Sequence, residues 1–327
     1  MATGSMFDKQ VSSLPEVAPA QSRPMPTLHA EEDEPPETVL EAGPGWQLIN
    51  LRELWRFRDL LAILAWRDVK VRYKQTVLGV AWAILQPTLC MILFTAFLGK
   101  LAHVPSGDIP YPLFVYAGLL LWTLFATGVS GAANSVISSE QLITKVYFPR
   151  MLIPVAAVGV ALVDFLVATV VLAILMACYG YWPGWSLLWA PALIGLTALA
   201  AVGAGAFLAA VTVRYRDFRH VLPVLMQFGL LATPVIYLDA SQAALQQTVA
   251  NTDGNPVAER VATVPDGLQV AFDLNPLNGI IAEFRSSLLS RAVSWRHLLV
   301  PGVIILAMFI VGCLFFQRAE NSFADTI

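Results

Sequence analysis

Charged residues are scarce in this sequence. Only 13% of its 327 residues are charged, 57% are hydrophobic, and the mean hydropathy is positive. A soluble domain usually carries about 25% charged residues. A shortfall this large calls for an apolar solvent, and the lipid bilayer is the default explanation. The net charge of −3 says little about partners, because it averages an acidic tail with basic flanks of the apolar stretches.

Cysteine and histidine are also few. Cys90, Cys178 and Cys313 fall inside apolar runs far apart in the sequence, and the four histidines are equally scattered. Such cysteines are typically buried small hydrophobic residues rather than disulfide partners or metal ligands. We therefore expect no metal site.

Motifs for nucleotide binding and covalent catalysis are missing as well. The sequence has no G-x-x-x-x-G-K-[ST] phosphate loop, so the chain cannot hydrolyse ATP by that route. Paired carboxylates, a Ser–His–Asp set and a nucleophile elbow cannot be assembled convincingly from its residues. The chain is therefore expected not to be an enzyme and to bind no cofactor of its own.

Residues 1–45 differ from the rest. Seven prolines interrupt any helix, Glu31 to Glu34 form an acidic run, and nothing has the order of a secretory signal. This segment is expected to be a disordered acidic cytoplasmic tail.

Six apolar stretches are long enough to cross a bilayer, which takes about 20 residues each. They lie at 77–99, 111–136, 151–179, 186–212, 220–238 and 298–316. Unpaired backbone is costly in lipid, and the alternating pattern of a barrel is missing, so each is expected to be a helix. The fold class predicted is an all-α integral membrane protein with six transmembrane helices, an N-terminal amphipathic interface helix and short re-entrant outer helices.

Lysine and arginine set the expected orientation. Most of them lie in the segments on the even side, and this bias places both termini in the cytoplasm and the longest loop outside. The domains expected are the tail 1–45, the interface helix 46–76, spans one to five in 77–238, the extracytoplasmic loop with gate helices 239–297, and span six with the C-terminus in 298–327.

Small residues repeat every four positions in the fourth span, at Ala201, Gly205 and Ala209. This spacing lets another helix approach closely. Packing within the chain is the ordinary interpretation, and a dimer seam is the sharper alternative.

Residues 46–76 are basic and aromatic and too polar to cross. On a helical wheel five cations fall in one arc with Asp59, broken only by Ile63, and Leu54, Phe57, Leu61, Leu64 and Ala65 lie opposite. This pattern predicts a helix in the cytoplasmic interface with its cations toward lipid headgroups or a partner. The cations are Arg52, Arg56, Arg67, Lys70 and Lys74. Residues 69–74 also alternate like a strand, but the polar arc stays in phase through Lys74, which favours helix.

Pro87 and Gln86 lie within the first span. A proline there kinks the helix, and Gln86 puts an amide near the freed carbonyl groups. A packing kink and a pore-lining bend both remain open.

The segment 134–150 joins spans two and three. Ser138 or Ser139 can cap a short helix, and Pro149 then ends this helix before the next span. An elbow with exposed apolar side chains suggests a docking surface, although a mere connector is the alternative. The apolar residues expected to be exposed are Leu142, Ile143, Tyr147 and Phe148. The basic loop 213–219 mainly indicates anchoring on the same side.

Three ionisable residues sit in apolar surroundings. Glu283 and Arg285 forbid a full crossing by the apolar segment 275–285, which favours a re-entrant or interfacial helix. Asp164 lies at bilayer depth, so it is either a functional residue or a hydrogen-bond partner for a neighbouring helix.

Aromatic residues recur in the spans. Most such residues are core or belt residues, but a ring of them around a passage would also suit sugars. They are Trp82, Phe94, Phe97, Trp122, Phe125, Phe228 and Tyr237.

With these segments in place, the sequence resembles the permease subunits of type-2 ABC exporters for polysaccharides, which export O-antigen, capsule and teichoic acid. The likeness covers about residues 50–320. It rests on five matches in order: Leu78-Gly79…Trp82…Pro87, Val146 to Arg150, Leu162 to Phe165, Val213 to Asp217, and Asn275-Pro276-Leu277…Gly279 to Arg285.

The resemblance implies a homodimer that pairs with two copies of a separate ABC ATPase subunit, which binds ATP and Mg. It implies a multi-pass protein of the cytoplasmic (inner) membrane that handles lipid-linked polysaccharide and not nucleic acid. The segment 140–150 resembles the coupling helix, with Glu140, Gln141, Leu142, Lys145, Tyr147 and Arg150 toward the ATPase. The stretch 51–74 resembles an interface helix beside a lateral opening for the lipid-linked substrate. The helix 275–290 resembles part of the outward gate. The channel or gate residues expected are Trp82, Trp122, Phe125, Asp164, Phe228, Tyr237, Glu283 and Arg285.

Two features depart from the family pattern, namely the long acidic tail and a polar insertion near 240–273. Two alternatives to polysaccharide export also stay open: an ABC exporter of small hydrophobic compounds or lipids, and a membrane enzyme acting on lipid-linked sugars.

Overall fold

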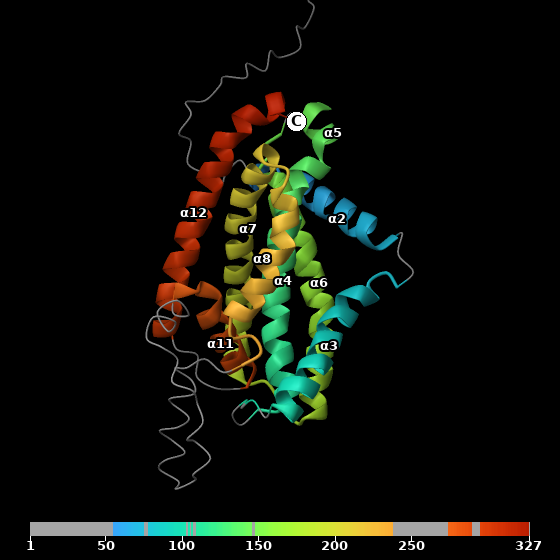
Figure 1. Ribbon diagram of the computed structural model, residues 1–327, viewed down its shortest axis with the longest axis vertical. Helices are drawn as coiled ribbons and strands as arrows, with labels where there is room; N and C mark the ends of the chain where they lie inside the picture. The colour runs from blue at the N-terminus through green and yellow to red at the C-terminus, as the bar shows by residue number, and fades with distance from the viewer. Residues whose placement is uncertain are drawn as a thin grey trace, which may run out of the picture. The chain divides into compact units, whose positions relative to one another are not determined.

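The computed structural model describes residues 55–74, 78–102, 104, 106, 109–145, 148–237, 274–289 and 295–326 (Figure 1). All belong to one compact unit, Gly45–Ile327. Within these residues the chain forms helices and connecting turns and no strand. The predicted all-helical class is therefore confirmed. The tail 1–45, Arg52, Tyr147 and the insertion 240–273 lie outside the described residues.

The helices follow one another along the chain as expected, with a few boundary shifts. They are α2 (Arg58–Lys74), α3 (Ala81–Phe94) with the π-helix η1 (Thr95–Leu101), α4 (Tyr111–Ser138), α5 (Glu140–Lys145), α6 (Leu152–Cys178), the 3-10 helix η2 (Trp185–Trp189), α7 (Ala190–Arg214), α8 (Phe218–Ala232), α11 (Pro276–Leu288) and α12 (Trp295–Thr326).

Five helical segments are long and apolar enough to cross a membrane: Ala81–Leu101, Tyr111–Ser138, Leu152–Cys178, Trp185–Arg214 and His297–Glu320. The remaining expected span, 220–238, contains α8, which has 15 residues. A helix of this length covers about 22 Å, less than the hydrocarbon thickness of about 30 Å. The described residues thus contain five full-length spans and one short apolar helix.

Helix α4 lies at the centre of the bundle, between α6 and α7, and α12 packs on α7 (Figure 1). The small residues of α7 make the close packing with α4 possible. A Cβ on Gly205 would meet the Cβ of Ala132 at 2.5 Å, and Ala201 and Ala209 are fully buried. The four-residue repeat therefore packs within the chain, and the dimer-seam alternative for it is wrong.

Two apolar clusters fill the bundle. One surrounds the start of α4 and contains Phe114, Leu120, Ile280 and Phe284, so it ties α4 to α11. The other joins the ends of α4, α6, α7 and α12 to α2 and α5. We refer to these two ends of the bundle as the α11 end and the α5 end.

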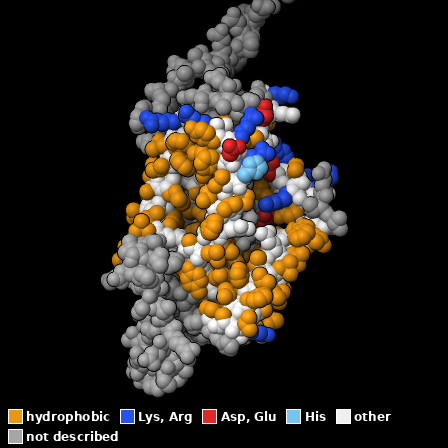
Figure 2. All heavy atoms as spheres, viewed as in Figure 1, with side chains coloured by type: hydrophobic (Ala, Val, Ile, Leu, Met, Phe, Trp, Pro, Cys, Tyr) orange, Lys and Arg blue, Asp and Glu red, His pale blue; other side chains and the backbone are white. Residues whose placement is uncertain are grey.

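The outside of the bundle is largely apolar (Figure 2). Helices α3, α8 and α12 expose large apolar side chains, including Ile92, Phe228 and Val303. Most Lys and Arg side chains in this view gather toward the α5 end. An apolar body with charges concentrated at one end is what a bilayer-spanning protein requires.

Helix α2 extends to Lys74, so the strand alternative for 69–74 is wrong. Its expected apolar face packs on the chain itself: Leu64 is buried in the α5-end cluster, and the Cβ of Ala65 lies close to Gly159 of α6. The opposite face is exposed and mixes Arg67, Lys70 and Lys74 with Ile63, Trp66 and Val71.

The elbow contains a short helix, α5. The backbone amides of Leu142 and Ile143 donate to the Ser139 carbonyl oxygen at its start. The expected exposure of two of its apolar residues is wrong, because Ile143 and Phe148 are only 9% and 5% exposed. Both belong to the α5-end cluster. They anchor the elbow to the bundle rather than offering an apolar surface.

Candidate functional site

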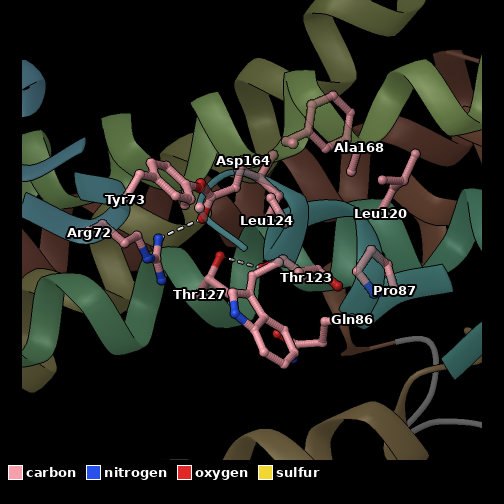
Figure 3. Close-up of a pocket in the computed structure, with 15 residues that line it drawn as sticks. Arg72, Tyr73, Gln86, Pro87, Leu120, Thr123, Leu124, Thr127, Asp164 and Ala168 are labelled. Atoms are coloured by element: carbon pink, nitrogen blue, oxygen red, sulfur yellow. Dashed lines mark hydrogen bonds and ion pairs between the residues drawn. The ribbon is translucent and has the colours of Figure 1, made fainter. Parts of the chain in front are cut away.

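A cavity of about 230 Å³ opens between α2, α3, α4 and α6 (Figure 3). Its lining mixes apolar and polar side chains. The apolar lining residues are Trp82, Pro87, Leu120, Leu124, Phe165 and Ala168, and the polar ones are Arg72, Tyr73, Gln86, Thr123, Thr127 and Asp164.

An ion pair joins α2 to α6 at this cavity. The Arg72 guanidinium donates to Asp164 Oδ2 at 2.6 Å, and the Tyr73 hydroxyl donates to Oδ1. Burial and this hydrogen bond raise the pKa of Tyr73 above its usual range, so the phenol stays a donor. The Arg72 side chain is 46% exposed and that of Asp164 only 13%. The arginine thus stands at the opening and the carboxylate stands behind it.

The sequence pointed to Asp164 but not to its partners. Arg72 lies on the opposite side of α2 from the arc of Arg67, Lys70 and Lys74, since two residues turn a helix by about 200°. A cation on the face expected to be apolar was the available signal. Residues 72 and 164 are 92 positions apart, so no local pattern could pair them.

Helix α3 contributes Trp82, Ala83, Gln86 and Pro87 to the cavity wall. Pro87 lies inside α3 and lacks the N–H that would bond the Ala83 carbonyl. Before α3 the chain turns at Gly79, whose φ of 49° favours glycine.

A larger groove of about 1210 Å³ continues from the cavity toward α5, and both share Arg72 and Thr127 as lining residues. The edge of α4 lines it with Thr127, Ser130, Asn134 and Ser138, spaced three to four residues apart. Thr127, Asn134 and Ser138 donate to carbonyl oxygens one turn earlier at 2.6–2.9 Å. Their own oxygen atoms can still accept hydrogen bonds from a bound molecule.

The elbow residues border the far end of this groove. Glu140, Gln141, Leu142 and Lys145 line it, and all but the half-buried Leu142 are exposed. Arg150 differs, since its guanidinium donates to the Glu320 carbonyl oxygen at 2.7 Å. The elbow is thereby tied to the end of α12.

Arg285 lies at the α11 end and is buried. It donates to the carbonyl oxygens of Phe114, Pro234 and Val235, and its guanidinium lies 3.6 Å from the centre of the Phe114 ring. These contacts join α11 to α4 and to the turn after α8. The structure therefore places Arg285 in the packed core.

Glu283 is also buried, and its carboxylate lies 3.3 Å from the exposed His297 at the start of α12. Asn275 caps α11 by accepting from the Leu277 amide at 3.1 Å.

The aromatic residues named from the sequence occupy different surroundings. Trp82 lines the cavity, whereas Trp122 and Phe125 pack together at 5.8 Å on α4. Phe228 is 66% exposed on α8, and the Tyr237 hydroxyl donates to the Leu231 carbonyl oxygen.

The cations of α2 lie at the surface. Arg56, Arg67, Lys70 and Lys74 are exposed, and the Lys70 ammonium lies 5.5 Å from the centre of the Trp66 ring. Arg67 pairs with its neighbour Asp68 at 2.8 Å.

Known proteins share this sequence pattern. The chain matches the ABC-2 type transporter family over residues 59–250. It is 34% identical over 188 residues to the O-antigen export system permease protein RfbA of Myxococcus xanthus, covering 57% of this chain and 71% of that protein. It is 26% identical over 271 residues to a permease of the same name from Klebsiella pneumoniae, covering 82% of this chain and 95% of that protein.

A shorter similarity, 29% over 75 residues, links the chain to the polysialic acid transport protein KpsM of Escherichia coli, covering 23% of this chain and 29% of that protein. The family match covers more than half of the chain and includes the helices from α2 to α8. The resemblance drawn from the sequence motifs is confirmed: this chain belongs to the ABC-2 type transporter family.

Proposed function

We propose that the chain is the membrane-spanning permease subunit of an ABC exporter that moves a lipid-linked polysaccharide, such as an O-antigen or capsule precursor, across the cytoplasmic membrane. The observation that carries this proposal is the similarity to the Klebsiella O-antigen export permease, which extends over 95% of that protein. Likeness along nearly the whole length supports a shared transport role better than a shared helix pair would.

Energy comes from a partner subunit in this proposal. The chain has no phosphate loop, so ATP and Mg are held by a separate ABC ATPase. Helix α5 is the docking element, with Glu140, Gln141 and Lys145 exposed toward that partner. The bond from Arg150 to Glu320 offers a direct route by which movement of the elbow reaches α12. The functional unit is a homodimer with two ATPase subunits.

Orientation follows from the charges. The α5 end carries most Lys and Arg in Figure 2, which supports a cytoplasmic location for this end and for both termini. Helix α8 and the turn Thr233–Tyr237 supply the sixth crossing, and α11 is the re-entrant helix of the outward gate. Glu283 and Arg285 hold that gate helix through buried contacts.

The exposed face of α2 suits the membrane surface. Arg67, Lys70 and Lys74 lie beside Trp66 on one side of the helix. Cations and an indole at this spacing favour contact with anionic lipid headgroups.

Reconstitution into liposomes tests the proposal. The chain with its ATPase and ATP should move a lipid-linked glycan to the opposite leaflet, detected by a glycosidase added to one side only. Full transport by the chain alone, without any nucleotide-hydrolysing partner, would contradict it. Conversion of the lipid-linked sugar by the purified chain would instead identify a membrane enzyme.

A matched pair of variants tests the elbow. Glu140→Ala is expected to uncouple ATP hydrolysis from transport, while Asp59→Ala, which removes an exposed carboxylate from the start of α2, should not. Normal transport by Glu140→Ala at normal protein levels would reject the elbow as the coupling element.

A further inference from the structure

Helix α12 makes a polar contact near each of its ends. At the α5 end, the Arg150 guanidinium of the elbow donates to the Glu320 carbonyl oxygen at 2.7 Å, and the Arg150 backbone amide donates to Glu320 Oε1 at 3.3 Å. At the α11 end, His297 Nδ1 lies 3.3 Å from the buried Glu283 carboxylate. One helix thus contacts both the element proposed to dock the ATPase and the element proposed as the outward gate.

The contact between α12 and α11 is also closely packed. A Cβ on Gly279 of α11 would lie 2.8 Å from Pro301 Cγ of α12 and 3.3 Å from the His297 carbonyl oxygen. Ile305 of α12 is fully buried in the same apolar cluster as Ile280 of α11. Because packed helices transmit displacement, a shift of α12 at this end displaces α11 as well.

Between its two ends α12 lies along α7 and meets it at a pair of glycines (Figure 1). A Cβ on Gly312 would collide with the Gly203 carbonyl oxygen, and one on Gly203 would lie 2.6 Å from Phe309 Cα. The two backbones therefore touch there without interlocking side chains, as small residues permit in membrane helices. Glu320 lies eight positions after Gly312 and Pro301 eleven positions before it, which gives arms of about 12 Å and 16 Å.

We propose that α12 is a lever that carries movement of the elbow to α11, with Gly312 as its pivot and with Arg150 and His297 as positioning residues at its two ends. Displacement of the elbow moves Glu320, tilts α12 about its crossing with α7, and moves Pro301 and α11 by a comparable distance at the other end. The roles of the elbow and of α11 in transport rest on the proposed function. The mechanical link between them rests on the contacts of α12.

Helices α4 and α6 offer the alternative route, because the elbow joins them directly along the chain. Helix α4 also meets α11, through the bond from Arg285 to the Phe114 carbonyl oxygen. The two routes differ in what Arg150 does. If movement passes through α4, loss of the Arg150 contacts leaves α11 unaffected, whereas a lever in α12 loses its inner attachment.

Hydrogen exchange tests the link on the full chain alone, in phosphatidylcholine nanodiscs. Arg150→Met keeps a long side chain but removes its donors, so the amides of α11 should exchange about threefold faster or more, although they lie at the opposite end of the bundle. Arg58→Met is the matched control, since Arg58 is an exposed arginine that contacts Asp59 and Trp55 of its own segment. Amides in the middle of α4 report whether the fold as a whole is intact.

The outer contact provides a second variant. His297→Phe keeps a ring but removes the nitrogen that faces Glu283, and should itself speed exchange in α11. Because the two contacts lie in series along one helix, Arg150→Met should add less in the His297→Phe background than in the wild type.

Three results would reject the lever. They are unchanged exchange in α11 of Arg150→Met, the same fold-increase in both backgrounds, and a rise that reaches the middle of α4 equally. The first of these would favour the route through α4, and the last would show a general loosening of the bundle.

Transport is measured separately, with the chain and its ATPase in liposomes. Arg150→Met should lower the amount of lipid-linked glycan moved per ATP hydrolysed, whereas equal losses of transport and hydrolysis would reject a positioning role. Normal export together with unchanged exchange in α11 would overturn the lever and leave the proposed function intact. Coupled exchange without any export by the wild-type complex would do the reverse.

Discussion

Two charged residues in the bundle, Arg72 at the α5 half and Arg285 at the α11 end, show how differently a protein of this kind can use an arginine. Arg285 is 6% exposed and bonds three backbone carbonyl oxygens. Arg72 is half-exposed and bonds a carboxylate beside a cavity. Fixed carbonyl groups around a buried cation leave nothing to exchange, whereas a single carboxylate partner can be replaced by another anion.

A charge in an apolar segment is therefore not by itself a sign of transport function. Burial and the type of partner separate the two cases. Leaving buried acceptors without their donor is costly, so Arg285 is expected to matter more for folding than Arg72.

The largest effect is expected at Arg285. Arg285→Ala leaves three carbonyl oxygens without their donor at the junction of α4, α11 and the turn after α8. Each buried acceptor left unpaired costs about 1–3 kcal/mol, so the protein should be destabilised by about 3 kcal/mol or more. Thermal unfolding in detergent and the yield of inserted protein measure this. Ser286→Ala, on the same helix, is the control and should stay close to wild type. A stable Arg285→Ala variant would show that Arg285 is not needed for folding.

Gly118→Ala probes the same junction from the other side. An added Cβ would lie within contact of the Arg285 guanidinium and 2.9 Å from the Val235 carbonyl oxygen. Overpacking of this kind destabilises by about 1–3 kcal/mol. The loss should shrink in an Arg285→Ala background, because the two groups then no longer collide. Additive losses in the unfolding midpoint would show that the two sites act independently.

A smaller and asymmetric effect is expected at the other arginine. Arg72→Gln leaves the less exposed Asp164 carboxylate without its cation, and should lower stability by about 1 kcal/mol. Asp164→Asn leaves a half-exposed arginine that water can solvate, so the loss should be smaller still. Thermal unfolding of both variants, with Arg58→Gln as the control, ranks their losses of stability. A larger loss for Asp164→Asn than for Arg72→Gln would contradict the deeper burial of Asp164.

The smallest effect on stability is expected at the elbow. Glu140 is exposed at the start of α5, so Glu140→Ala should change stability by no more than about 0.5 kcal/mol. Ile143→Ala should be more harmful because Ile143 belongs to the α5-end cluster. Comparing the unfolding midpoints of these two neighbours separates anchoring from docking. Equal midpoints would contradict the burial of Ile143.

Much of the architecture could be predicted from the sequence. The starts of α4, α6 and α7 fall within a few residues of the expected spans, and α5 ends before Pro149 as expected. Helix α8 was predicted too long because Thr233 to Tyr237 are apolar enough to extend the run, yet the chain turns there. Hydropathy reports the environment of a segment and not whether its backbone is helical.

The site was only half visible in the sequence. Asp164 was identified because a carboxylate in an apolar run is unusual. Its partners, the cavity and the groove along α4 were missed, and so was the burial of Arg285 among backbone carbonyl oxygens. The burial of Ile143 and Phe148 was missed because an elbow between two spans has no periodic pattern from which its inner side can be inferred.

By itself, the sequence determined that this is a helical membrane protein without an ATP-binding loop, where its apolar helices lie, and where the elbow falls. These are local properties, since the length of an apolar run and the need to satisfy backbone groups in lipid are set within each segment. Only the tertiary structure decided that Arg72 meets Asp164 and that Arg285 is enclosed by carbonyl oxygens. Those contacts depend on how each helix is rotated against its neighbours, and that rotation is fixed by the packing of small residues such as Gly205 against Ala132.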